Sequence, residues 1–155
     1  MSEWRLEYRD YVPEQQGLRE SLCALGNGYF VTRAAATDVE AGEVHYPGTY
    51  VAGAYNRLTS RVQGREIENE SLVNCPNWLP LAIRIEDGDW LHPDHCEVLD
   101  YRQELDIARG LLVRRFRYRD GEGRVTACRE RRLVSMASCH LAATELTVTP
   151  ENWSG

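Results

Sequence analysis

The sequence predicts an all-β fold, an antiparallel sandwich or barrel, and three observations lead to that prediction. Several segments alternate apolar and polar residues with the period of two that a half-buried strand requires. Asn-Gly and Asp-Gly pairs, which favour tight turns, and prolines punctuate these segments at intervals of about 8–12 residues. Helical periodicity is weak along the chain. With 155 residues, of which 43% are hydrophobic, the sequence suits one globular domain.

The first half of the chain contains two of the predicted strands and a loop. Segment 4–12, "WRLEYRDYV", alternates apolar with charged side chains and predicts the first strand. Segment 36–47 is polar, and we expect a long surface loop there. Segment 79–90, "LPLAIRIEDGDW", places three apolar residues on one face before an Asp-Gly turn. It therefore predicts another strand that enters a hairpin.

The second half of the chain carries stronger strand patterns. Segment 100–116 has some helical propensity, but Gly110 interrupts it, so we predict two strands. A hairpin turn is expected at 120–123, "DGEG". The last predicted strand, 140–150, is rich in Thr and Val and ends at a proline.

Segment 20–34, "ESLCALGNGYFVTRA", contains a Gly-Asn-Gly centre that suits either a phosphate cradle or a turn. A dinucleotide-binding loop needs a third glycine where this chain has Val31, and a P-loop needs a lysine, which the chain lacks. The residues that follow favour a strand. We therefore predict a hairpin turn at Asn27 and Gly28, with both residues tolerating positive φ and with Leu22 in the strand before the turn.

The charge is unevenly distributed. All 18 basic residues are arginines, and the net charge is −6. Nine arginines lie within 109–132 beside three acidic residues, a local balance of +6. Such a stripe is one signature of a nucleic-acid surface. We favour the alternative, a β-hairpin whose arginines line a solvated or domain-facing surface, because the whole chain is acidic and no recognition motif accompanies the stripe.

The cysteines and the hydropathy pattern predict the compartment. The chain has an odd number of widely spaced cysteines, which we interpret as reduced thiols: Cys23, Cys75, Cys96, Cys128 and Cys139. No apolar run approaches the ~20 residues of a membrane span. The amino terminus "MSEWRLEYRD" is polar and unlike a secretory signal. We expect a cytoplasmic protein with neither a membrane nor a nucleic acid as partner.

Paired carboxylates are the first candidates for chemistry, because general acid–base catalysis often uses two carboxyl groups at one site. Two pairs share a strand face at i, i+2: Glu66 with Glu68, and Glu104 with Asp106. Solvated strand charges explain both pairs as well. For the second pair, ion pairing with Arg102 or Arg109 is the favoured interpretation.

The segment "HPDHC" brings His92, His95 and Cys96 close in sequence, and zinc favours such ligands. A structural zinc site needs four ligands, and no second motif supplies the rest. We interpret these residues as part of a surface loop and expect no metal.

Aromatic residues beside amides are the best candidates for ligand contacts, because a flat ligand face can stack on an aromatic ring while an amide hydrogen-bonds beside it. "CPNWLP" holds Trp78 between two prolines beside Asn77, and "GTYVAGAYNR" offers Tyr50, Tyr55 and Asn56. The alternative is packing in a core or against another domain.

Five stretches together resemble the amino-terminal part of glycoside hydrolase family 65, which includes maltose, kojibiose and trehalose phosphorylases. They are "ESLCALGNGYFVTRA", "YPGTYVAGAYN", "ESLVNCPNWLPLAIRIEDG", "LDYRQELDIARGLLVRRFRYRD" and "RERRLVSMASCHLAATELTVTPENWSG". The similarity runs in register along nearly the whole chain. Val31 and Ala34 stand where the family usually has glycine, and Cys23 stands where an aromatic is common.

This resemblance implies that 1–155 is an amino-terminal β-sandwich domain of the galactose-mutarotase-like super-sandwich kind, here incomplete. A linker and an (α/α)6 barrel would follow, and the barrel would hold the catalytic glutamate and bind inorganic phosphate as co-substrate. We expect this chain to be inactive alone, to need no cofactor, and to pack against the barrel. Unpaired strand edges would favour a homo-oligomer. The resemblance also implies that the ligand of the candidate contact residues is a sugar: Trp78, Asn77, Tyr50, Tyr55 and Asn56. The alternative is a free-standing carbohydrate-binding module for an α-glucose disaccharide.

Overall fold

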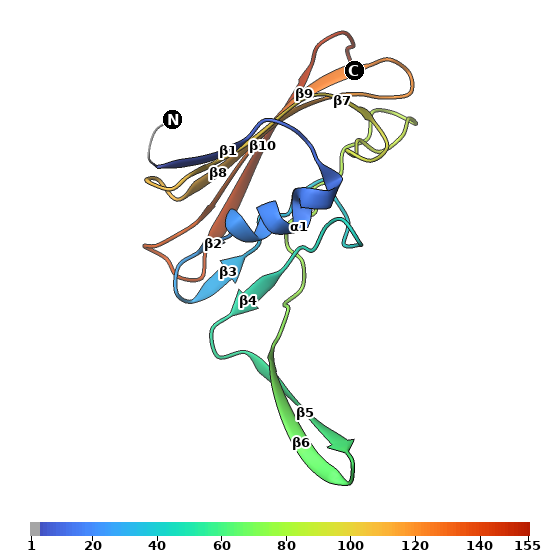
Figure 1. Ribbon diagram of the computed structural model, residues 1–155. Coiled ribbons are helices and arrows are strands. Elements are labelled where there is room, and N and C mark those ends of the chain that lie inside the picture. Colours follow the sequence, from blue (N-terminus) through green and yellow to red (C-terminus); the bar gives the residue numbers. More distant parts are fainter. Residues whose placement is uncertain (1–3) are drawn as a thin grey trace.

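The chain folds into two antiparallel sheets, one helix and a hairpin that extends away from them (Figure 1). The computed structural model describes residues 4–155. The elements are β1 (Arg5–Tyr8), α1 (Pro13–Leu22), β2 (Leu25–Gly26), β3 (Phe30–Thr32), β4 (Thr49–Val51), β5 (Tyr55–Val62), β6 (Arg65–Leu72), β7 (Glu97–Asp106), β8 (Leu111–Arg119), β9 (Val125–Val134) and β10 (Ala142–Pro150). This architecture confirms the predicted all-β antiparallel fold.

The larger sheet contains five strands in the order β1-β7-β8-β9-β10, all antiparallel. The two strands predicted in 100–116 are β7 and β8. They are joined at Gly110, whose φ of +61° is a conformation that glycine adopts without penalty. The predicted turn at 120–123 joins β8 to β9, and the predicted last strand is β10. β1 occupies only the first part of the strand expected in 4–12.

One face of the five-stranded sheet carries the hydrophobic core in two clusters. The first cluster joins β7, β8 and β9 to the end of α1 and to β2 through Leu105, Leu112, Val134, Cys23 and Leu25. The second joins the same three strands to the segment before β7 through Tyr101, Phe116, Tyr118, Cys128, Ile85 and Leu91. Between the clusters, cross-strand register places Arg114 opposite Gln103 on one side and Glu130 on the other. The core face therefore contains a charged row.

Helix α1 was not predicted, and Leu22 lies in it and not in a strand. The helix begins with a proline in its first turn, where the missing N–H costs nothing. Its buried side chains are polar, namely Gln16, Arg19 and Glu20. An apolar stripe is the usual sequence sign of a helix, so a helix that buries polar groups escapes that criterion.

The smaller sheet, β2-β3-β4, contains the turn expected at Asn27 and Gly28. Of these two residues, only Gly28 uses positive φ, +83°. The predicted turn is therefore present, but Asn27 does not adopt the positive φ that it could tolerate. Asn27 acts through its side chain instead. Its Oδ1 accepts hydrogen bonds from the backbone N–H groups of Tyr29 and Phe30, and its Nδ2 donates to the carbonyl of Ser135. The turn is thereby tied to the end of β9.

β5 and β6 form a long hairpin that points away from the rest of the molecule (Figure 1). Gln63 and Gly64 at its tip both have positive φ, 51° and 79°, the backbone of a tight hairpin turn. Every residue of the two strands is exposed. The hairpin therefore has no packing partner within residues 4–155.

One loop prediction and one strand prediction need correction. Segment 36–47 is irregular as expected, but it is not a surface loop throughout, because Thr37, Asp38 and His45 are buried. Segment 79–90 is not a regular strand. Its only ladder contact is a bridge between Arg84 and Trp90 around the Asp-Gly turn. Both segments supply side chains to the core face, which sets their paths without regular hydrogen bonding.

Candidate functional site

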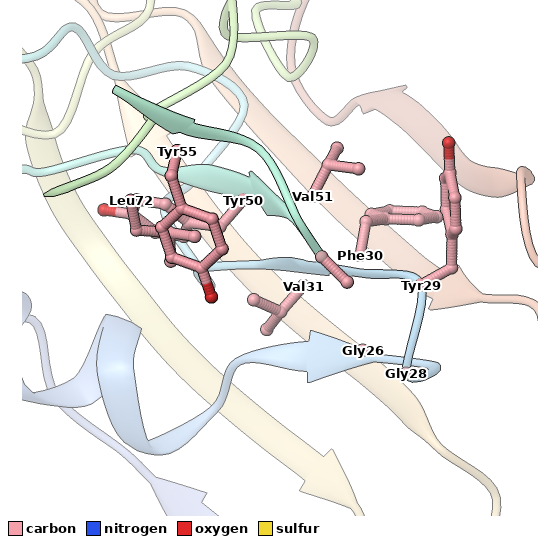
Figure 2. Close-up of a pocket in the computed structure, with 10 residues that line it drawn as sticks. Gly26, Gly28, Tyr29, Phe30, Val31, Tyr50, Val51, Tyr55 and Leu72 are labelled. Carbon is pink, nitrogen blue, oxygen red and sulfur yellow. The ribbon is translucent and has the colours of Figure 1, made fainter. Parts of the chain in front are cut away.

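An apolar hollow of about 270 Å³ lies beside the small sheet, at the base of the β5–β6 hairpin (Figure 2). In Figure 2, Tyr29 and Phe30 occupy one end and Tyr50 and Tyr55 the other, with Val31 between them. Tyr55 is 55% exposed. The hollow offers few polar groups besides tyrosine hydroxyls. It is suited to an apolar side chain and less suited to a sugar ring with many hydroxyls.

The β5–β6 hairpin that extends from this hollow has two different faces. One face pairs arginine or threonine with glutamate across the strands: Arg57 with Glu70, Thr59 with Glu68 and Arg61 with Glu66. Tyr55 and Leu72, which line the hollow, lie on the same face as these charged pairs. The other face exposes Leu58, Val62 and Ile67, by 61%, 51% and 43%. An isolated two-stranded hairpin is marginally stable in water, and exposed apolar patches mark contact surfaces. This apolar face has the composition of an interface.

A second, larger cleft of about 830 Å³ opens between segment 37–45 and segment 77–95. Its lining includes the exposed indole of Trp90 and the imidazoles of His92 and His95, which stand 5.0 Å apart between ring centres. Burial lowers the pKa of His92, although the nearby Asp94 carboxylate opposes that shift. Polar and aromatic groups converge here, as they do in small-molecule sites.

A hydrogen-bonded chain fixes one wall of the cleft. His45, which is 3% exposed, lies 2.8 Å from Glu20 Oε1 through Nδ1 and 3.0 Å from the Tyr11 hydroxyl through Nε2. The Tyr11 hydroxyl donates to Asp94 Oδ1 at 3.0 Å. Glu20 Oε2 also accepts from the backbone N–H of Tyr46. Glu20 of helix α1 thereby holds segment 37–45 in place, and Tyr11 links that segment to Asp94 on the other side of the cleft.

Beneath the cleft lies the charged row of the core face. Arg114 donates to Asp38 and, at 3.2 Å from its Nε, to Glu130. Burial lowers the pKa of Arg114, but these two carboxylates outweigh it and raise the pKa well above its ordinary value. Arg132 also pairs with Glu130, yet burial lowers its pKa. Tyr118 donates to Asp38 at 2.9 Å.

The arginine stripe forms the predicted β-hairpin, but two of its arginines, Arg114 and Arg132, are buried and do not lie on the expected solvated or domain-facing surface. Strand alternation turns Arg114 and Arg132 into the core and leaves the other strand arginines outside. Seven of the nine have an acidic partner within 4.0 Å among residues 4–155. Arg115 and Arg129 face each other across β8 and β9 without one among those residues. The stripe is largely neutralised in place.

The candidate carboxylate pairs are ion-paired or solvated, as the sequence analysis favoured. Glu104 lies 3.1 Å from Arg102, and Asp106 lies 3.7 Å from Arg109, which confirms both expected ion pairs. Glu66 and Glu68 are exposed on the hairpin. All five cysteines are free, as predicted.

The five predicted sugar-contact residues do not form one site. Tyr50 and Tyr55 line the apolar hollow, and Asn77 lines the cleft. Asn77 Oδ1 accepts from the Leu79 N–H. Trp78 is 38% exposed and lines neither, and Asn56 lies on the exposed hairpin opposite Ser71. Sequence reasoning considered Asn77, His92 and His95 of the cleft but did not bring them together as one site. It missed His45 and its partner Glu20, although Glu20 opens the first resembling stretch and His45 directly precedes the second.

The described residues contain neither a cluster of metal ligands nor a membrane-spanning helix. Across residues 4–155, no group of three or more His, Cys, Asp or Glu side chains is placed to hold a metal ion. In the same part of the chain, no helix has the length and hydropathy to cross a bilayer.

Sequence comparisons relate the whole chain to known proteins. The model of the glycosyl hydrolase family 65 N-terminal domain matches residues 6–155. An uncharacterized glycosyl hydrolase of Mycobacterium tuberculosis is 49% identical over 152 residues, 98% of this chain and 12% of that protein. A kojibiose phosphorylase of Caldanaerobacter subterraneus is 34% identical over 154 residues, 99% of this chain and 19% of that protein. The chain thus spans less than a fifth of either relative.

A structure comparison agrees on the fold. A solved structure assigned as a kojibiose phosphorylase, from the human microbiome, superposes with a TM-score of 0.86 at 24% identity, over 95% of this chain and 20% of that one. Fold and sequence together define this chain as the β-sandwich domain that begins longer carbohydrate-active proteins. It belongs to the glycosyl hydrolase family 65 N-terminal domain family.

Proposed function

We propose that this chain is the non-catalytic domain of an inverting α-glucoside phosphorylase or hydrolase and that it packs against the catalytic (α/α)6 barrel. The observation that carries the proposal is the match of 99% of the chain to 19% of a kojibiose phosphorylase. The barrel would supply the catalytic glutamate and bind inorganic phosphate, and this chain would use no cofactor. Its five free thiols fit a cytoplasmic protein.

The buried carboxylates support a structural role. Asp38, Glu130 and Glu104 each lie within hydrogen-bonding distance of an arginine, so each is engaged in a contact inside the fold. A general acid for glycoside cleavage must instead reach the leaving-group oxygen of a substrate. The acidic groups of the core therefore suit scaffolding.

The apolar face of the β5–β6 hairpin and the hollow at its base are the surfaces that we assign to the barrel. The apolar hollow and, on the other face of the hairpin, the exposed Leu58 and Ile67 offer anchor points of the kind that dominate protein interfaces. Tyr50 and Tyr55 belong to this contact surface in the proposal. A second copy of the whole enzyme would add a dimer contact elsewhere.

The test is assembly with the part of the Mycobacterium tuberculosis relative that lies outside the matching region. The 155-residue chain should form a stable complex with that part in gel filtration. Leu58→Ser combined with Ile67→Ser should weaken the complex by at least about tenfold, because it removes two apolar anchors. Thr59→Ala, on the charged face of the same hairpin, is the matched control and should leave it unchanged.

Two outcomes would contradict the proposal. One is the absence of any complex with the unsubstituted chain, or equal weakening by Thr59→Ala. The other is release of glucose 1-phosphate when the isolated chain is incubated with phosphate and kojibiose, maltose or trehalose. We expect no release from this chain alone.

A further inference from the structure

We propose that the cleft between segments 37–45 and 77–95 binds a neutral saccharide. This inference goes beyond the scaffolding role, since it gives the domain a ligand of its own. The cleft of about 830 Å³ falls within the roughly 300–1,000 Å³ of small-molecule sites. The apolar hollow, at about 270 Å³, falls below that range.

Trp90 provides an aromatic surface in this cleft. Its side chain is 53% exposed although the Arg84 guanidinium stacks over the ring at 5.1 Å from its centre. The backbone bridge between these two residues brings them side by side, and the stacked guanidinium restrains the indole. A ring held in this way offers an apolar face with little loss of side-chain entropy on binding, and pyranose faces pack on such rings.

The charges of the cleft select the ligand. Four carboxylates line it, and Asp38 is already occupied by Arg114, which leaves Glu40, Glu43 and Asp94 to accept hydrogen bonds from hydroxyl groups. No arginine is among the described lining residues, and the chain has no lysine. Phosphate and sugar phosphates would therefore be repelled. A neutral compound with several hydroxyl groups can donate hydrogen bonds to these carboxylates without electrostatic repulsion.

The wall of the cleft is organised before any ligand arrives. Asp94 accepts from Tyr11, which in turn contacts the buried His45, and the Asp94 N–H donates to His92 Nδ1 at 3.1 Å. Groups fixed in this way lose little freedom on binding. The two imidazoles and the Asn77 amide add donors that complement the carboxylates.

The experiment is a titration of the 155-residue chain with kojibiose and with maltose, in which binding is measured by calorimetry and by tryptophan fluorescence. We expect saturable binding with a Kd in the range of about 1–10 mM. Trp90→Ala should weaken it at least about tenfold. Trp78→Ala is the matched control, because Trp78 is also partly exposed but does not line the cleft, and it should change nothing.

Asn77→Ala and Asp94→Asn provide second variants in case Trp90→Ala fails to fold, and each should weaken binding at least about threefold. Glucose 6-phosphate should bind more weakly than glucose by at least about tenfold. The inference is overturned if no saturable heat of binding appears up to about 50 mM disaccharide, or if all cleft variants bind disaccharide as tightly as the unsubstituted chain. It is also overturned if Trp78→Ala abolishes binding, or if glucose 6-phosphate binds as tightly as glucose. Assembly through the hairpin is measured separately, so either proposal can fail alone.

Discussion

The guanidinium of Arg114 donates a hydrogen bond to the carboxylate of Asp38, which lies 76 residues earlier in the chain. Both side chains are only 4% exposed. Arg114 stands in the central strand of the five-stranded sheet, and Asp38 belongs to an irregular segment that lines the cleft. One buried ion pair therefore fixes a loop of the cleft onto the sheet.

Asp38→Asn should lower the free energy of unfolding by about 3 kcal/mol, because removing one member of a buried pair leaves the partner charge poorly compensated. Glu130 still contacts Arg114 and limits the loss. Urea unfolding followed by circular dichroism measures the change.

Glu145→Gln is the control for that substitution. Glu145 pairs with Arg131 on the outer face of the sheet, where both side chains are at least 40% exposed. Exposed pairs of this kind contribute at most about 1 kcal/mol. A larger loss from Glu145→Gln than from Asp38→Asn would show that the charged row of the core is not what holds the loop.

The strands of the large sheet could be predicted because their segments alternate and because Gly110, the turn at 120–123 and Pro150 mark boundaries between or after them. The sequence alone did not allow us to predict which arginines of these strands are buried. Alternation shows that Arg114 and Arg115 point to opposite faces, but hydrophobicity alone assigns an arginine to solvent. Only the carboxylates of Asp38 and Glu130, distant in sequence, make burial of Arg114 tolerable.

The cleft was missed for a related physical reason. Its residues lie in segments without periodic patterns, and long-range side-chain contacts set their paths. Glu20 illustrates this, because it is 2% exposed in a helix with no apolar stripe and contacts His45 25 residues away. The predicted sugar residues were chosen as aromatics beside amides, which is a local criterion. It found Asn77 in the cleft but not Trp90.

Gly28→Ala should destabilise the protein by about 1 kcal/mol. Gly28 has φ of +83°, and an added Cβ would meet no atom within 4 Å, so the cost is backbone strain alone. Gly17→Ala is the opposite case, since Gly17 lies in α1 with equally open space and ordinary helical φ. It should stabilise by about 0.5 kcal/mol. Thermal unfolding of the two variants should therefore shift in opposite directions, and shifts in the same direction would contradict the assigned turn.

Tyr11→Phe should loosen the wall of the cleft. The substitution removes the hydroxyl that contacts His45 and Asp94, each at 3.0 Å, at a cost of about 1 kcal/mol. Amide hydrogen exchange should accelerate in 36–47 and 92–96 more than in the large sheet. Tyr29→Phe, at a residue 40% exposed and outside this network, is the control and should leave exchange in both segments unchanged. Uniform acceleration across the sheet would indicate a global loss instead.

The five thiols should react with an aromatic disulfide reagent in an order set by burial. Cys139 is exposed and should react first, while Cys23 and Cys128 are buried and should react only when the chain unfolds. Burial raises the pKa of Cys23, and burial together with the Asp38 carboxylate raises the pKa of Cys128 to about 12. Neither thiol therefore forms an appreciable thiolate at pH 8, and raising the pH from 7 to 8 should not hasten their reaction. Full reaction of all five in denaturant is the control. Labelling of Cys128 in the folded protein at the rate of Cys139 would show that the second core cluster opens readily, and that the ion pair of Arg114 with Asp38 beside it does not close that part of the sheet.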